Sequence, residues 1–294
     1  MKTIVLGPPG TGKTETLLRE VEKYLKTTDP NRIGYFSFTQ KAANEGRDRA
    51  MDKFNLTEDD LPYFRTLHSL AFRRLGLKKE NVMQREHYAK VGRETDLRVD
   101  YNEWDDEMTG LFTTKSDYLS IIQLAKLKNI TLEQQYNLKE HTQDVSVQKL
   151  KNLSSELESY KKAHGLIDYN DMILDFIKSD SSPEFDVVFI DEAQDLSKMQ
   201  WDMAKTIWNK TKDSYIAGDD DQAIFKWAGA DVNSFITLGG EFIKLTQSYR
   251  IPAKVHEFAM KIINKVGNRI PKDWKPRTVE GKLSTYSDFR HIDM

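Results

Sequence analysis

Residues 3–14 read Thr-Ile-Val-Leu-Gly-Pro-Pro-Gly-Thr-Gly-Lys-Thr, and Glu-Thr-Leu-Leu follows at 15–18. The apolar run predicts a buried strand, the glycines predict a tight turn, and the residues after the turn predict a helix. G-x-x-x-x-G-K-T in this setting is typical of a loop whose backbone N–H groups and helix N-terminus surround phosphate oxygens. A chance glycine turn is the alternative, but the full pattern with these flanks is restrictive. The stretch therefore predicts that the chain binds a nucleoside triphosphate.

Each polar position of this loop has an expected role. The Lys13 ammonium would reach the β- and γ-phosphates, and the Thr14 hydroxyl would be a ligand of Mg²⁺. ATP and Mg²⁺ are thus the expected cofactors. The expected nucleotide contacts are Gly7, Pro8, Pro9, Gly10, Thr11, Gly12, Lys13, Thr14 and Glu15.

The composition bounds the class of protein. The chain has 294 residues, enough for two domains, with 38% hydrophobic and 31% charged residues. It has no cysteine, which excludes disulfides, thiolate metal sites and cysteine nucleophiles. No apolar run approaches the ~20 residues that span a membrane, and Met1 and Lys2 lead straight into the first strand without a signal peptide. We therefore expect a cytoplasmic protein that has no membrane partner.

The charge is unevenly distributed. The whole chain has a net charge of −2, but residues 244–294 contain eleven lysines and arginines against five aspartates and glutamates. This basic segment could bind nucleic acid or a partner, or it could be an ordinary solvated face. The acidic residues between 94 and 107 match no metal-site spacing and are interpreted as a solvated face. They are Glu94, Asp96, Asp100, Glu103, Asp105, Asp106 and Glu107.

Alternation of strands and helices predicts an α/β fold with a parallel sheet. Further strands are expected at 33–38, 63–66, 187–190 and 215–217, and helices at about 40–53 and 67–75. Between about 73 and 164 strand signals vanish, and helical spacing, as in 149–162, predicts an inserted helical subdomain. Functional residues of parallel sheets gather at the carboxyl ends of the strands. The glycine loop, Asp191-Glu192 and Gly218-Asp219 all follow such ends.

A second motif, Ile190-Asp191-Glu192-Ala193-Gln194-Asp195, follows the strand at 187–190. We expect Asp191 to hold Mg²⁺ and Glu192 to polarise the attacking water. Paired acids after a strand often only cap the next helix. The phosphate-binding loop in the same chain favours the chemical interpretation.

The order of motifs resembles the UvrD/Rep family of superfamily 1 DNA helicases. After the glycine loop come Phe38-Thr39-Gln40-Lys41-Ala42-Ala43, Thr66-Leu67-His68-Ser69, Asp168-Tyr169-Asn170-Asp171-Met172 and Asp191-Glu192-Ala193-Gln194-Asp195. Gly218-Asp219-Asp220-Asp221-Gln222-Ala223-Ile224-Phe225-Lys226-Trp227 and Ser248-Tyr249-Arg250 complete the series. The resemblance implies a RecA-like ATP-binding domain 1A at 1–72 and 165–245. It also implies a helical subdomain 1B at 73–164 and the start of a second motor domain, 2A, at 246–294.

The resemblance also implies roles for single residues. Gln222 resembles the glutamine that senses the γ-phosphate, Arg250 an arginine finger, and Tyr249 the residue that stacks on adenine. Phe38, Thr66, His68, Phe225 and Trp227 resemble DNA-contacting positions. Taken singly, Phe38 and Trp227 could be core residues, His68 a helix cap and Arg250 a surface ion pair.

The implied activity is ATP hydrolysis coupled to 3′–5′ movement along single-stranded DNA, with duplex junctions as further partners. The chain departs from the family pattern in three respects. Domain 2A is expected to be a stub that lacks the second arginine. The chain is then either a fragment or one part of a motor that a second chain completes. The glutamine motif expected before the glycine loop is absent, and Ala228 stands where the family usually has arginine. An ATP-gated binding module without unwinding, or the helicase part of a helicase–nuclease complex, are the alternatives.

Overall fold

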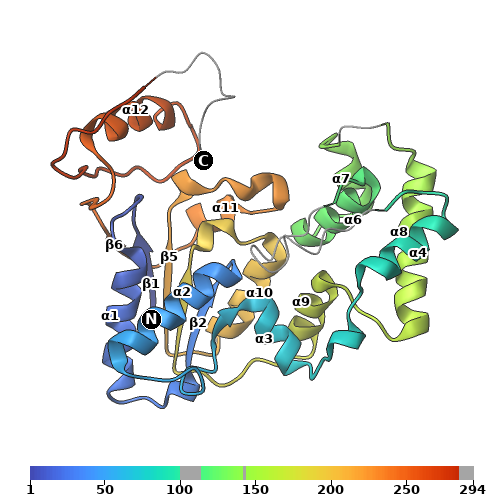
Figure 1. The fold of residues 1–294 in the computed structure, drawn as a ribbon, viewed down its shortest axis with the longest axis horizontal. Coiled ribbons are helices and arrows are strands. Elements are labelled where there is room, and N and C mark those ends of the chain that lie inside the picture. The colour runs from blue at the N-terminus through green and yellow to red at the C-terminus, as the bar shows by residue number, and fades with distance from the viewer. Residues whose placement is uncertain (100–113, 142–143, 285–294) are drawn as a thin grey trace.

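The computed structural model describes residues 1–99, 114–141 and 144–284. Its centre is a six-stranded sheet in the order β3-β2-β4-β5-β1-β6, and every pairing in it is parallel (Figure 1). The strands are β1 Lys2–Leu6, β2 Ile33–Ser37, β3 Phe64–Thr66, β4 Val187–Asp191, β5 Asp213–Gly218 and β6 Glu241–Lys244. The α/β class with a parallel sheet is confirmed.

Helices cover both faces of this sheet. Alternate strand residues such as Val5 and Phe189 pack against α1 (Lys13–Leu25) and α2 (Gln40–Phe54). Their neighbours, such as Ile190, pack against α3 (Leu67–Arg74), α9 (Tyr169–Lys178), α10 (Lys198–Trp208) and α11 (Val232–Ile236). Strands β1, β2, β4 and β5 are therefore buried on both faces, which explains why they are nearly continuous apolar runs.

The edge strand β6 was not predicted from the sequence. Its four residues are all exposed, and it pairs with β1 on one side only. A short, exposed segment with a charge at each end carries neither the alternation nor the apolar run that indicates a strand. The predicted strands and helices otherwise agree with the structure to within one or two residues at most ends.

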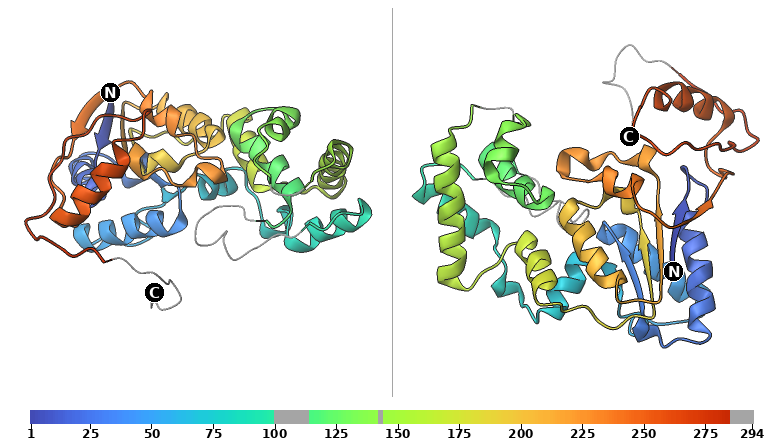
Figure 2. Two further views of the ribbon diagram at one scale, coloured as in Figure 1. Left: turned by 90° about the horizontal axis from the view of Figure 1, so that it is seen from above. Right: turned by 180° about the vertical axis from the view of Figure 1, so that it is seen from behind.

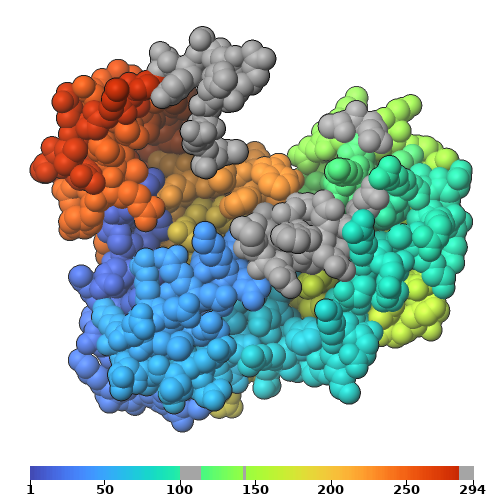
Figure 3. Space-filling model, viewed as in Figure 1, coloured from blue at the N-terminus to red at the C-terminus, as the bar shows by residue number. Residues whose placement is uncertain are grey.

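The helical insertion is also present. Its helices are α4 Arg85–Glu94, α6 Asp117–Lys128, α7 Leu132–Asn137 and α8 Val147–His164, and they enclose a core of their own. They lie beside the sheet in the ribbon views (Figure 1, Figure 2), and the same helices form the right-hand part of the space-filling view (Figure 3). The part of 73–164 that the structure describes contains no strand, apart from an isolated bridge between Val82 and Ile167. Of the acidic residues predicted to form a solvated face, those from 100 to 107 lie outside the described residues.

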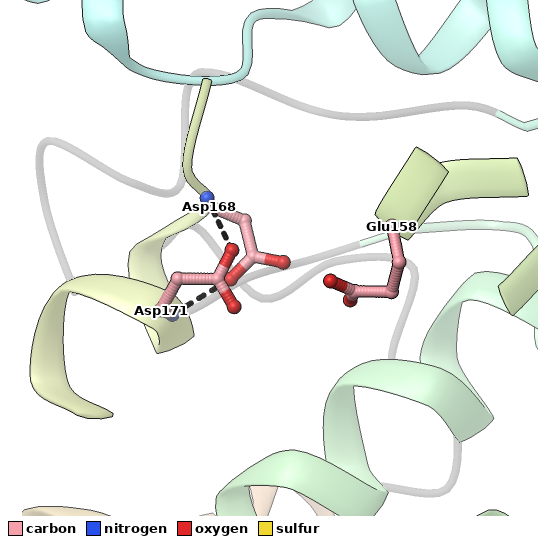
Figure 4. Close-up of side chains that lie close together, drawn as sticks. All are labelled: Glu158, Asp168 and Asp171. Atoms are coloured by element: carbon pink, nitrogen blue, oxygen red, sulfur yellow. Dashed lines mark hydrogen bonds between the residues drawn. The ribbon is translucent and has the colours of Figure 1, made fainter. Parts of the chain in front are cut away.

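A cluster of charged side chains joins this helical group to α9, with Asp168 and Lys161 buried and Glu158 at its exposed edge. Glu158, Asp168 and Asp171 bring carboxylate oxygens within 4.8 Å of one another (Figure 4). Lys161 Nζ lies 2.5–3.0 Å from all three carboxylates, and Lys126 Nζ lies 2.8–3.1 Å from them. Two ammonium groups thus occupy the space a cation would need, so the cluster is an ion-pair network.

The chain after β6 forms a small unit near the glycine loop. It contains α12 (Ala253–Ile263) and an extended segment that returns to pair Gln247 with Lys275. In Figure 1 this unit lies above the β1 end of the sheet. Among the described residues, no helix has the length and apolar character required to cross a membrane.

Candidate active site

The glycine loop joins β1 to α1. Gly10 and Gly12 have φ angles of 71° and 86°, the left-handed region that residues with a Cβ rarely adopt. The Lys13 side chain is buried, and its Nζ donates a hydrogen bond to the Gly7 carbonyl at 3.1 Å. The same atom lies 3.9 Å from Glu192 Oε2. The loop thus places its lysine between the first and second predicted motifs.

Thr14, in the first turn of α1, lies beside Asp191 at the end of β4, so the two residues predicted to hold one cation are brought together. Thr14 Oγ1 donates a hydrogen bond to Asp191 Oδ2 at 2.7 Å. Tyr35, which sequence reasoning missed, donates its phenol to the same oxygen at 2.9 Å. Burial and the Asp191 carboxylate raise the pKa of Tyr35, so its phenol stays a donor and orients Asp191. A hydroxyl beside a carboxylate is a donor set that fits Mg²⁺.

Glu192 has an unusual backbone. Its φ is 51°, a left-handed conformation that costs energy in a residue with a side chain. Gln194 Nε2 donates a hydrogen bond to Glu192 Oε2 at 2.9 Å and also contacts Asp195 Oδ2 at 3.2 Å. Burial, followed by the charge of Glu192, raises the pKa of Asp195 to about 7. Because of its hydrogen bond, Gln194 positions the Glu192 carboxylate. Gln194 was part of the predicted motif, but nothing in the sequence indicated this role.

Gln222 is connected to the same group through Asp219. Gln222 Nε2 donates to Asp219 Oδ2 at 2.7 Å, and the Asp219 backbone N–H donates to Gln194 Oε1 at 3.0 Å. Gly218 allows this approach, because a Cβ there would lie 2.8 Å from Gln194 Oε1. A continuous chain of hydrogen bonds thus joins the motif after β5 to the motif after β4.

Residues 248–250 lie directly on the glycine loop. Ser248 Oγ donates to the Pro9 carbonyl at 2.7 Å, and the Tyr249 N–H donates to the Gly10 carbonyl at 2.9 Å. A Cβ on Gly10 would lie 2.3 Å from Arg250 Cβ. From the sequence we expected only the stub of a second motor domain here, with Arg250 on a poorly supported segment. The structure instead anchors it, and Tyr249 presents a ring that is 75% exposed beside the loop.

The predicted DNA contacts fall into two groups. Phe38, Thr66 and His68 line one cavity of about 400 Å³ at the ends of β2 and β3. Thr66 Oγ1 accepts a hydrogen bond from the Ser69 N–H and so caps α3. Burial lowers the pKa of His68 to about 4, so this ring is neutral near pH 7. Phe38 is only 5% exposed and also belongs to the core.

The second group extends from this cavity to the surface. The ring of Phe225 lies 5.7 Å from that of Phe38, and Trp227 lies 6.4 Å from Phe225. Trp227 is 63% exposed, which removes the alternative of a core residue. Sequence reasoning missed Arg65, which also lines the cavity. Burial, with the charge of Arg73 second, lowers its pKa to about 10.

Comparison with known proteins agrees with this geometry. Residues 1–243 match the UvrD/REP helicase N-terminal domain. The chain is similar to the ATP-dependent DNA helicase PcrA of Staphylococcus aureus and of Bacillus subtilis, with 24% identity to each. These alignments cover 99% and 96% of this chain but only 42% and 40% of the two helicases. A PcrA from Leuconostoc citreum is similar at the same identity.

The chain thus spans about two fifths of the length of the curated relatives it matches. The family match covers the whole sheet except the last residue of β6, and it includes the glycine loop, Asp191-Glu192 and Gln222. The chain therefore belongs to the UvrD/REP helicase family, as a carrier of its N-terminal domain.

Proposed function

We propose that this chain is the ATP-binding and ATP-hydrolysing part of a 3′–5′ single-stranded-DNA translocase or helicase. The observation that carries the proposal is the continuous chain of contacts between the glycine loop and an exposed tryptophan. It runs from Lys13 through Glu192, Gln194 and Asp219 to the 219–227 segment that bears Trp227. A motor needs such a connection, because nucleotide state has to change DNA contacts.

For the nucleotide, the loop N–H groups and Lys13 would hold the phosphates. Thr14 and Asp191, already hydrogen-bonded to one another, would be the protein ligands of Mg²⁺, which supplies charge neutralisation on the phosphates when bound. Tyr249, exposed beside the loop, would stack on the adenine. We propose all residues from Gly7 to Glu15 as nucleotide contacts, as expected from the sequence.

For hydrolysis, Glu192 would accept a proton from the attacking water. Gln194 Nε2 holds one of its oxygens, and the Lys13 ammonium lies 3.9 Å from the same oxygen. Gln222 would contact the γ-phosphate, and Arg250 would stabilise charge on the transferring group. The strained backbone at Glu192 supports this assignment, because such outliers gather at functional sites.

For DNA, Trp227 and Phe225 would provide stacking platforms, and the cavity lined by Phe38, Thr66 and His68 would receive the adjacent part of the strand. Stacking of a base on an aromatic ring contributes ~1–3 kcal/mol and does not depend on the base. We interpret residues 1–72 and 165–245 as domain 1A, 73–164 as 1B, and 246–294 as the start of 2A. The setting would be the cell interior, where DNA is present.

A second polypeptide segment is expected to complete the motor. Phe258, Ile262 and Val266, within and just after α12, are exposed apolar side chains. Phe258 and Ile262 lie four residues apart on one face of α12, and Val266 follows just beyond the helix end. Exposed apolar side chains grouped in this way are typical of a surface that another element covers. Without that element this chain would bind ATP but hydrolyse it slowly and unwind nothing. A chain that binds ATP without unwinding DNA would act as an ATP-gated DNA-binding or partner-binding module, which is the alternative function.

DNA-stimulated ATP hydrolysis tests the proposal. The chain should hydrolyse ATP slowly alone, and faster with single-stranded DNA once the remaining part of a 2A domain is supplied in cis or as a partner. A tailed duplex should be unwound only by the completed protein. Strong unwinding by the chain alone would refute the proposed division of activity. ATP-dependent DNA binding without hydrolysis in the completed protein would favour the binding module.

A further inference from the structure

Three consecutive aspartates after β5 are held by two cations from the segment after α12. Lys272 Nζ lies 2.7 Å from Asp219 Oδ1, 2.5 Å from Asp220 Oδ1 and 2.9 Å from Asp221 Oδ2. Arg269 makes a two-pronged contact to Asp221, with Nε at 2.8 Å from Oδ1 and Nη2 at 2.6 Å from Oδ2. The two elements are about fifty residues apart in the sequence, so this contact is purely tertiary.

The ammonium of Lys272 is an internal part of the fold. Its side chain is 3% exposed and that of Asp219 is fully buried. Burial alone would lower the pKa of Lys272, but the three carboxylates outweigh it and raise that pKa above its ordinary value. Burial raises the pKa of the Asp219 carboxyl, and the positive charge of Lys272 opposes this rise. Lys272 is therefore the cation that pairs with the buried Asp219 carboxylate.

Asp219 divides its two oxygens between this lysine and the nucleotide site. Oδ1 contacts Lys272, while Oδ2 accepts the hydrogen bond from Gln222 Nε2 at 2.7 Å. The backbone N–H of the same residue holds Gln194, which in turn holds Glu192. One residue, Asp219, thus joins the segment after α12 to the side chains that would meet the γ-phosphate and the attacking water.

We propose that Lys272, supported by Arg269, is a positioning residue that fixes Gln222 through Asp219 and so couples the placement of the 246–284 unit to ATP hydrolysis. The inference rests on the proposed function of Gln222. A movement of the 246–284 unit away from the sheet would withdraw Lys272 from Asp219. Gln222 and Gln194 would then lose their common anchor. Part of the basic excess of residues 244–294 is therefore internal, where it neutralises the acidic loop.

Single-turnover ATP hydrolysis and titration with a fluorescent ATP analogue, both with Mg²⁺ and the full 294-residue chain, test the inference. Lys272→Met keeps the length of the side chain and removes its charge. We expect hydrolysis to slow by about 10- to 100-fold, by analogy with metal sites, where this is the typical loss when a residue that orients a ligand is replaced. Affinity for the analogue should change little, because the phosphate loop is intact. Lys272→Arg should recover most of the rate.

Two comparisons separate positioning from general damage. Lys275→Met is the matched control, since Lys275 lies on the same segment with an exposed side chain, and it should hydrolyse ATP at the wild-type rate. In a Gln222→Ala background, Lys272→Met should cause little further slowing, because both changes remove the same contact. Independent, additive slowing would overturn the inference.

The outcomes also distinguish the inference from the function beneath it. Wild-type hydrolysis by Gln222→Ala would refute the proposed role of Gln222. A slow Gln222→Ala beside a normal Lys272→Met would refute only the positioning role. If Lys272→Met loses its cooperative melting transition, Arg269→Met decides, since that guanidinium lies at the rim of the cluster. If Arg269→Met slows hydrolysis a few-fold, and this slowing disappears in the Gln222→Ala background, the inference is supported. If Arg269→Met hydrolyses ATP at the wild-type rate, the inference is overturned.

Discussion

The ion-pair network between α8 and α9 should be a principal attachment of the helical group to the sheet domain. Lys161→Met removes an ammonium that is nearly fully buried and lies 3.0 Å from Asp168 Oδ2 and 2.5 Å from Asp171 Oδ2. Removing one partner of a buried pair costs about 3–5 kcal/mol. Lys126 remains within 3.1 Å of both aspartates, so we expect a smaller loss here, about 2–3 kcal/mol.

The loss should depend on pH with a definite sign. Burial alone would raise the pKa of Asp168, but Lys126 and Lys161 outweigh it and hold that pKa well below its ordinary value. A carboxyl with a lowered folded-state pKa contributes stability above its unfolded pKa of about 3.9 and loses it as the pH falls further. The difference between wild type and Lys161→Met should therefore be full at pH 7 and shrink from about pH 5 downward.

Urea denaturation of the full chain at several pH values measures this difference. Lys162→Met is the matched control, because Lys162 is the next residue on α8 and its side chain is exposed. Thermal denaturation at pH 7 is a second measurement. The unfolding midpoint of Lys161→Met should lie about 3–5 °C below that of the wild type, a shift that follows from the expected loss of stability and the unfolding entropy of a chain of this length. Equal stability of the two variants, or a difference that grows as the pH falls, would refute the reasoning.

Three further predictions concern the site. Glu192→Gln should retain ATP binding and lose hydrolysis, since it removes the base and keeps the shape; calorimetry and phosphate release measure the two. Trp227→Ala should weaken binding of several homopolymer single strands about equally, by ~1–3 kcal/mol in a fluorescence titration. Gly10→Ala should destabilise the chain more than Gly12→Ala in thermal melting. Both glycines have a positive φ, but a Cβ at Gly10 would lie 2.3 Å from Arg250 Cβ, whereas a Cβ at Gly12 would have its nearest neighbour, Glu15 Cβ, at 3.9 Å.

Each of the three has a contrary outcome. Native hydrolysis by Glu192→Gln would require another residue to activate the water. Loss of binding to one homopolymer only would indicate base readout by Trp227, and Ile224→Ala, which removes another exposed apolar side chain nearby, controls for loss of surface. Equal melting of the two glycine variants would mean that residues 248–250 do not rest on the loop.

The sequence predicted the parts of the structure that local patterns encode. The apolar runs of β1, β2, β4 and β5 and the glycine loop each carry their signal within a few adjacent residues. The pairing of Thr14 with Asp191 followed from the rule that functional residues gather at the carboxyl ends of parallel strands. Local signals and topology were sufficient for these elements.

The missed features depend on contacts between distant residues. Tyr35 belongs to an apolar strand, and nothing nearby shows that its hydroxyl reaches Asp191. Lys272 lies in a basic segment whose excess charge indicated a surface, whereas its ammonium is buried among three carboxylates. Gln194 was quoted within a motif, but its link to Asp219 requires β4 and β5 to be neighbours. Pairing of side chains across the fold cannot be read from composition or spacing.

Calorimetric titration of the full chain with ATP, with and without Mg²⁺, tests the central claim that the glycine loop and the Thr14–Asp191 pair form a magnesium–nucleotide site. The account predicts binding that requires Lys13, weakens when Mg²⁺ is removed, and is unchanged in Lys26→Ala, an exposed lysine at the far end of α1. Wild-type affinity for magnesium–ATP in Lys13→Ala would contradict it.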